Sequence, residues 1–166
     1  EIITNTLLCK LFYQLQENGR LTREGLVKFI ASMGILPEDQ LKILNVAFER
    51  YFAKDYVSAI HILIPQFESF FLAASEKLGI DVIALNRTQE ISTQPKTLGA
   101  AHLDAIEFQE VWGKDLCEQI KFILFEPLGY KLRHRTAHGE VKFGECNYQN
   151  ASLIIYLFLT VCSRRI

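Results

Sequence analysis

The sequence predicts an all-α fold, a helical bundle built around one hydrophobic core. Apolar residues recur three and four positions apart over most of the chain, which is the period of one helix face. Gly and Pro are sparse, at 9 and 4 of 166 residues, and no stretch of useful length alternates as a half-buried strand would. The chain has 166 residues, of which 49% are hydrophobic, so it is long and apolar enough to bury a core as one folded unit.

The first two predicted helices are short and form an N-terminal extension over residues 1–36. An amphipathic helix is predicted over residues 2–15 and ends at Gly19. Its apolar positions are Ile3, Leu7, Leu8, Leu11, Phe12 and Leu15. Thr22 is expected to cap a second helix that stops near Gly34.

The main bundle is predicted over residues 37–166 and begins with two longer helices. The sequence Pro37-Glu38-Asp39 indicates a helix start, because proline is tolerated in the first turn and acids suit the N-terminal dipole. A second, largely buried helix is predicted over residues 56–78.

His61 and Glu68 are seven positions apart and share one face of that second helix. The plainer interpretation is two hydrogen-bonded polar groups beside the core. The alternative is a supporting role in catalysis, behind residues that contact a substrate.

The second half of the chain contains a polar stretch and three further predicted helices. Residues 81–97 are rich in Thr, Gln and Asn and are interpreted as a linker. A short helix is expected within 98–108, and Asp115 is expected to cap a clearer one that stops at 126–129. The last helix, over 147–163, is apolar on nearly every side, so it is either the centre of the bundle or part of a subunit interface.

Charge, cysteine spacing and hydropathy exclude several classes of protein. The net charge of −1 provides no global attraction for nucleic acid, so anion binding requires a local cluster. The four cysteines lack CxxC spacing, which disfavours a zinc site and indicates reduced thiols of an intracellular protein. The longest apolar run, residues 153–162, is about half of what spans a bilayer. The chain begins without Met or a leader-like segment, so we interpret it as part of a longer protein, with regulatory domains expected in the remainder.

The most concentrated positive charge lies in the acid-free segment 127–139, between a helix stop and the last helix. Its basic or titratable side chains are Lys131, Arg133, His134, Arg135 and His138. Arginine offers a planar fork of donors that suits phosphate oxygens, and histidine can move a proton near neutral pH.

Arg133 and His138 are the candidate catalytic pair. On a continuous helix, side chains five positions apart point about 140° away from each other. A site in which both contact one phosphate therefore requires the backbone to turn between them. The alternative is a solvated basic loop without chemistry.

These residues also match a known signature. Arg133-His134 followed by His138 fits the Arg-x4-His pattern of HEPN domains, in which the residue after Arg is typically Asn, Asp or His.

Three stretches in order extend the resemblance: residues 56–68, 96–99 and 132–139. Together they resemble a HEPN-like family of unassigned function that has LRNRxAHG at the third stretch. That family occurs in an endoplasmic-reticulum-associated RNA degradation protein and in bacterial proteins. The resemblance covers about residues 40–165, and His134 replaces the commoner Asn.

The resemblance implies a HEPN-type bundle that forms a homodimer with a composite active site and cuts RNA without a metal or other cofactor. His138 would act as general base or acid, and Arg133 would stabilise charge on the phosphate. His134, Arg135 and Lys131 would orient the pair or hold the RNA backbone. His61 and Glu68 would support them.

The function expected from the sequence is a metal-independent endoribonuclease for single-stranded RNA, in a toxin, phage-defence or RNA-decay protein. One alternative is a non-catalytic module that binds a nucleotide, RNA or a protein partner. Another is a dimerisation domain, which the apolar last helix favours.

Overall fold

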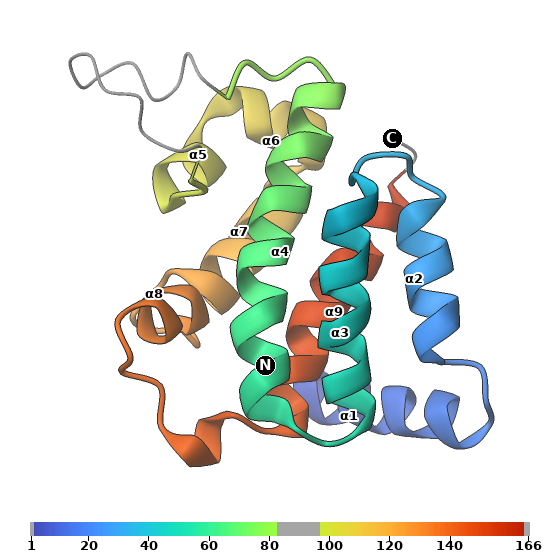
Figure 1. Ribbon diagram of the computed structural model, residues 1–166. Helices are drawn as coiled ribbons and strands as arrows, with labels where there is room; N and C mark the ends of the chain where they lie inside the picture. The colour runs from blue at the N-terminus through green and yellow to red at the C-terminus, as the bar shows by residue number, and fades with distance from the viewer. Residues whose placement is uncertain (1, 83–96, 165–166) are drawn as a thin grey trace.

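The computed structural model of the chain describes residues 2–82 and 97–164. Within these ranges the chain is helical and contains no strand, so the all-α prediction is confirmed (Figure 1). The stretch interpreted as a linker, residues 81–97, lies almost entirely outside the described residues.

Most of the predicted helices are present with nearly the predicted ends. The elements in chain order are α1 Ile2–Glu17, α2 Arg23–Ala31, α3 Glu38–Phe52, α4 Tyr56–Lys77, α5 Ala100–Asp104, α6 Ile106–Trp112, α7 Lys114–Leu124, α8 Leu132–Ala137, the 3-10 turn η2 Phe143–Glu145, and α9 Tyr148–Ser163. The single short helix expected within 98–108 is instead two helices, because Ala105 adopts an extended conformation with ψ of 141°.

Local capping explains several of these boundaries. The Thr22 hydroxyl accepts a hydrogen bond from the Gly25 amide at 3.0 Å, as predicted, and starts α2. The Asn147 side chain accepts one from the Asn150 amide at 3.0 Å and starts α9. Such caps satisfy amides that have no partner within the helix.

The prediction that Asp115 caps α7 is wrong. The N-cap is Gly113, which has a φ of 81° and ψ of 142°, so the helix begins two residues earlier than expected, at Lys114. Asp115 lies in the first turn instead, where its carboxylate interacts favourably with the helix dipole.

The helices form a bundle with a side layer (Figure 1). Helix α4 contacts α3 and α9, α2 contacts α3, and α1 packs on α9. In Figure 1, α1 lies across one end of the bundle, whereas α5 and α8 lie on the side of α4 that faces away from α2. Helix α8 contacts both α4 and α7.

Helix α9 lies at the centre of the core. The Phe158 side chain is fully buried, and its ring centroid is 6.5 Å from that of Phe48, 5.2 Å from Phe67 and 5.4 Å from Phe70. These rings come from α3 and α4, so the nearly all-apolar sequence of α9 is explained by burial on most sides.

A buried polar network binds α1 into the same core. The hydroxyl groups of Tyr51 and Ser152 are 2.8 Å apart, which joins α3 to α9. The Gln16 amide nitrogen donates to the hydroxyls of Tyr51 at 2.9 Å and Tyr148 at 3.2 Å. The division between residues 1–36 and the main bundle stays a prediction.

One described helix, α4, is long and apolar enough to cross a bilayer, with a mean hydropathy of 1.4 over its best window. Half of that window is buried inside the bundle. Length and composition alone are a weak indication of a membrane span, because core helices of globular proteins have the same properties.

Replacing the central ring of the core tests this packing. Phe158→Ala is expected to lower the free energy of unfolding by about 3–5 kcal/mol, because it removes buried aromatic contacts and leaves a cavity. Urea unfolding followed by circular dichroism measures the change. The matched control is Phe143→Ala, since that side chain is 86% exposed and the expected change is within about 0.5 kcal/mol. Equal losses in the two variants would contradict the assigned core.

The cysteines give a second test of burial. All four are free, and burial raises the pKa of the Cys117 thiol to about 11 and that of Cys162 to about 12. These two thiols are therefore expected to resist a disulfide reagent in the native protein at about pH 8, because the thiolate is the reactive form. They should react at full rate once the chain is unfolded in urea. Rapid labelling of all four thiols in the folded protein would oppose this placement.

Candidate active site

A close backbone approach sets the position of α8, which contains most of the basic cluster. The Tyr130 amide donates to the Phe122 carbonyl at 3.0 Å, and a β-carbon on Gly129 would lie 2.0 Å from that same oxygen. Lys131 then adopts a left-handed conformation with a φ of 51°, and buried Leu132 begins α8. The end of α7 and the start of α8 are therefore held together by the backbone.

The turn that a phosphate shared by Arg133 and His138 within one chain would require is absent. The chain is helical from Leu132 to Ala137, and the His138 amide donates to the His134 carbonyl at 3.0 Å. Helix α8 ends at Ala137 with His138 as its C-cap, and Gly139 follows with a φ of 68°, a helix-stopping conformation. A helical path separates the directions of Arg133 and His138 by about 140°.

Arg133 is held by Glu68 of α4. The Arg133 Nε donates to Glu68 Oε1 at 3.0 Å, and the two side chains are 29% and 13% exposed. Burial raises the pKa of Glu68, and the positive charge of Arg133 opposes that rise. The structure thus brings together two residues of the predicted site that are 65 positions apart in the sequence.

Arg135 binds a residue that the sequence did not single out. Its Nη2 forms an ion pair with Glu145 Oε2, and the Lys142 amide donates to the same oxygen at 2.8 Å. The Arg135 carbonyl also accepts from the Glu140 amide at 2.7 Å. Hydrogen bonding to Arg135 is the main cause of the lowered pKa of Glu145. Arg135 therefore folds η2 back onto the end of α8.

His134 and His138 form a contacting pair on the outer side of α8. Their ring centroids are 4.4 Å apart, with an angle of 48° between the ring planes. His138 is exposed and His134 is half-buried. The four-residue spacing brings the two side chains onto the same helix face.

Lys131 and His61 are the two remaining predicted site residues. Lys131 is half-buried and forms no ion pair within the described part of the chain. His61 is exposed on α4, and its Nδ1 donates to the Val57 carbonyl at 2.8 Å. Among the described residues, no hydrogen bond or ion pair links His61 to Arg133 or Glu68.

Two buried polar atoms of α4 and α8 have no hydrogen-bond partner among the described residues. They are Gln66 Oε1 on α4 and Thr136 Oγ1 on α8. Burying such a group without a partner costs about 1–3 kcal/mol, so neither atom stabilises the fold through a hydrogen bond within the described residues.

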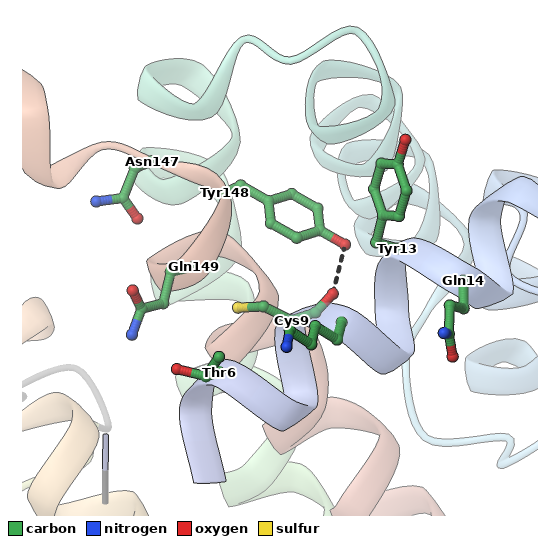
Figure 2. A pocket seen from close by; sticks show the side chains of 8 residues that line it. Thr6, Cys9, Tyr13, Gln14, Asn147, Tyr148 and Gln149 are labelled. Carbon is green, nitrogen blue, oxygen red and sulfur yellow. Dashed lines mark hydrogen bonds between the residues drawn. The ribbon is translucent and has the colours of Figure 1, made fainter. Parts of the chain in front are cut away.

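A groove of about 540 Å³ lies elsewhere on the molecule, between α1 and the start of α9 (Figure 2). It is lined by Thr6, Cys9, Lys10, Tyr13, Gln14, Asn147, Tyr148 and Gln149. In Figure 2 the Tyr148 hydroxyl points to the Cys9 carbonyl, which accepts its hydrogen bond at 3.5 Å. The sequence did not predict this groove, because its two walls are more than 130 positions apart.

The Arg133–Glu68 pair can be tested by a double-mutant cycle. Arg133→Ala is expected to cost about 1–3 kcal/mol, less than the 3–5 kcal/mol of a fully buried pair because Arg133 is partly exposed. Glu68→Gln in the same chain should recover part of that loss, since it removes the unpaired buried charge. Urea unfolding of both single variants and the double variant measures the coupling. Strictly additive losses would show that the two groups do not interact.

The same pair makes stability depend on pH. The folded-state pKa of Glu68 lies above its unfolded value, so the folded protein binds this proton more tightly. The contribution of Glu68 to stability is therefore fully present below its unfolded pKa. It is lost as pH rises from the unfolded pKa through the higher folded pKa. Arg133→Ala removes the opposing charge and should extend the window upward. Unfolding curves at a series of pH values compare the variant with wild type, and identical profiles would contradict the assignment.

Comparisons of the chain with models of protein families, with curated proteins and with solved structures give no significant match. The HEPN-like resemblance thus stays a prediction from the sequence.

Proposed function

We propose that the chain is a HEPN-type bundle that acts as a metal-independent endoribonuclease on single-stranded RNA. The observation that supports this best is the way in which Glu68 binds Arg133. The Glu68 carboxylate accepts a hydrogen bond from the Nε of Arg133. Within the described residues, the two terminal nitrogens of the Arg133 guanidinium make no hydrogen bond. Arg133 is thereby fixed in orientation and still offers two donors to a phosphate.

The proposed reaction is an internal transfer at phosphorus. The 2′-oxygen of a ribose attacks the adjacent phosphodiester and forms a bond to phosphorus, and the bond to the 5′-oxygen of the next nucleotide breaks. His138 accepts the 2′-hydroxyl proton or donates one to the leaving oxygen. Arg133 stabilises the negative charge that develops on the phosphate oxygens. The products are a 2′,3′-cyclic phosphate end and a 5′-hydroxyl end.

The helical path of α8 makes a second copy of the chain part of this proposal. Arg133 contacts α4, whereas His138 is exposed about 140° away around the helix. A homodimer can place Arg133 of one copy and His138 of the other at the same phosphate. Two-fold pairing forms two such composite sites.

The neighbouring basic residues have separate proposed roles. Lys131 and His134 hold or orient the RNA backbone next to the reacting phosphate. Arg135, whose charge is paired with Glu145, positions the segment that follows α8. Among the residues that the structure describes, His61 makes no contact that supports a role at this site.

The second candidate function is a non-catalytic module that binds RNA or a nucleotide. The angular separation of Arg133 and His138 within one chain favours it, because each group could hold a phosphate without acting on a shared one. An intracellular toxin, defence or RNA-decay protein fits either function.

Cleavage of labelled single-stranded RNA in EDTA tests the first function. His138→Ala should lower the rate by about 10²–10⁴-fold, and because His138 is exposed the fold should be preserved. Arg133→Lys keeps a positive charge beside Glu68 and should also lower the rate, because the single ammonium nitrogen of lysine cannot bind Glu68 and a phosphate through separate nitrogens of a planar fork. Mass spectrometry of the products identifies the cyclic phosphate. Tight RNA binding without any cyclic-phosphate product would favour the non-catalytic module, and wild-type rates in His138→Ala would exclude this mechanism.

Mixing two variants of reduced activity tests whether the site is composite. Arg133→Lys and His138→Ala proteins are unfolded together and refolded, so that mixed dimers form. If each site takes its arginine and its histidine from different copies, one intact site forms in every mixed dimer and part of the activity returns. No recovery in a preparation that contains mixed dimers would show that both groups come from one chain.

A further inference from the structure

We propose that His134 and His138 together bind a divalent transition metal ion through their imidazole nitrogens. Where the proposed ribonuclease function holds, this ion inhibits the enzyme, because it occupies the imidazole that would transfer the proton. The inhibitory part of the proposal rests on that function, whereas the metal site does not.

The first argument is the geometry of the pair. His138 continues the helical hydrogen bonding through its amide, so the two side chains lie about 40° apart around α8. Imidazole nitrogens bind zinc at about 2.0–2.1 Å, so two donors to one ion lie at most about 4.2 Å apart. The nitrogens lie at the edges of the imidazole rings. Because the ring centroids of His134 and His138 are 4.4 Å apart, one nitrogen of each ring can come within about 4.2 Å of the other. The same i, i+4 spacing places two histidines on one zinc ion in helical metalloprotease motifs.

The second argument concerns the surrounding charge. A cation beside Arg133 and Arg135 would be repelled if both guanidinium groups were unpaired. Glu68 of α4 neutralises the charge of Arg133, and Glu145 of η2 neutralises the charge of Arg135. The local repulsion is therefore much smaller than the sequence of the segment suggests.

The identity of the ligands limits the metals and the strength of binding. Imidazole suits Zn²⁺, Cu²⁺ and Ni²⁺, whereas Mg²⁺ and Ca²⁺ prefer oxygen ligands. The described residues contain no group of three or more His, Cys, Asp or Glu side chains that could hold a metal. The site is therefore an open two-ligand site, with solvent in the other positions, and the ion is exchangeable and not required for folding.

Direct titration of the protein with NiCl₂ by isothermal calorimetry tests the site, with a non-chelating reductant present. Ni²⁺ is the probe because it prefers imidazole to the thiols of Cys9 and Cys146. His134→Asn and His138→Ala should each weaken Ni²⁺ binding by at least about tenfold, since even outer-shell partners change metal affinity by about 10–100-fold. His61→Ala is the matched control, because that histidine is exposed on a helix and has no second histidine four positions away. Unchanged affinity in His134→Asn, or equal loss in His61→Ala, would overturn the proposal.

Inhibition is measured separately, as the cleavage rate with Ni²⁺ divided by each protein's own metal-free rate. Wild type should be inhibited, and His134→Asn should need at least about tenfold more Ni²⁺ for the same fractional inhibition. Ni²⁺ binding that depends on both histidines, in a protein that does not cleave RNA, would support the metal site and reject the ribonuclease. Cleavage that Ni²⁺ does not inhibit, together with binding that depends on both histidines, would overturn the inhibitory part. Activation by Ni²⁺ would also overturn it.

Discussion

Burial of α9 on most of its surface is the constraint on which the other elements depend. An apolar helix of this kind must be covered from several directions. Helices α1, α2 and α4 pack on it here, and Phe48 and Tyr51 of α3 contact its side chains. Phe67 of α4 packs its ring on Phe158, and the next residue along α4 is Glu68. Since successive helical residues point about 100° apart, the packing of Phe67 inward directs Glu68 toward α8. The core therefore sets the orientation of the carboxylate that binds Arg133.

Much of the fold could be predicted because its boundaries have local causes. Thr22 and Asn147 have side chains that accept hydrogen bonds from the first helical turns, and both helices start there. Prediction fails where the cause is a backbone conformation. Ala105 divides α5 from α6, and Gly113 displaces Asp115 as the cap of α7. An alanine in an extended conformation has no signature in the sequence, because tertiary packing selects it.

The candidate site was predictable in its residues but not in its contacts. Charge density indicated Arg133, Arg135 and the two histidines, because the segment around them has no acid. The carboxylates that bind the two arginines lie outside this segment. Glu68 lies 65 positions from Arg133 in the sequence, and Glu145 lies ten positions after Arg135. Local sequence predicts helix periodicity, but it does not show which face of a short helix packs inward. For that reason the sequence left the path between Arg133 and His138 open, and the structure shows that it is helical from Leu132 to Ala137.

His134 places a second imidazole beside His138, where the motif that the sequence resembles commonly has Asn. In the resembling family Asn is commoner at position 134, and asparagine there would leave His138 as a single imidazole. The histidine in this chain creates a pair, but only because α8 remains helical as far as His138. The same helical path that separates Arg133 from His138 thus joins His134 to His138.

The lack of space at Gly129 has a consequence for comparing this chain with others. Any side chain there would collide with the Phe122 carbonyl, and the connection from α7 to α8 would have to take another route. The start of α8, and with it Arg133, would then be placed by a different connection. Glycine at this position is thus a marker for homologues that share this geometry. A homologue with the basic motif but a bulkier residue there must place its arginine by other means.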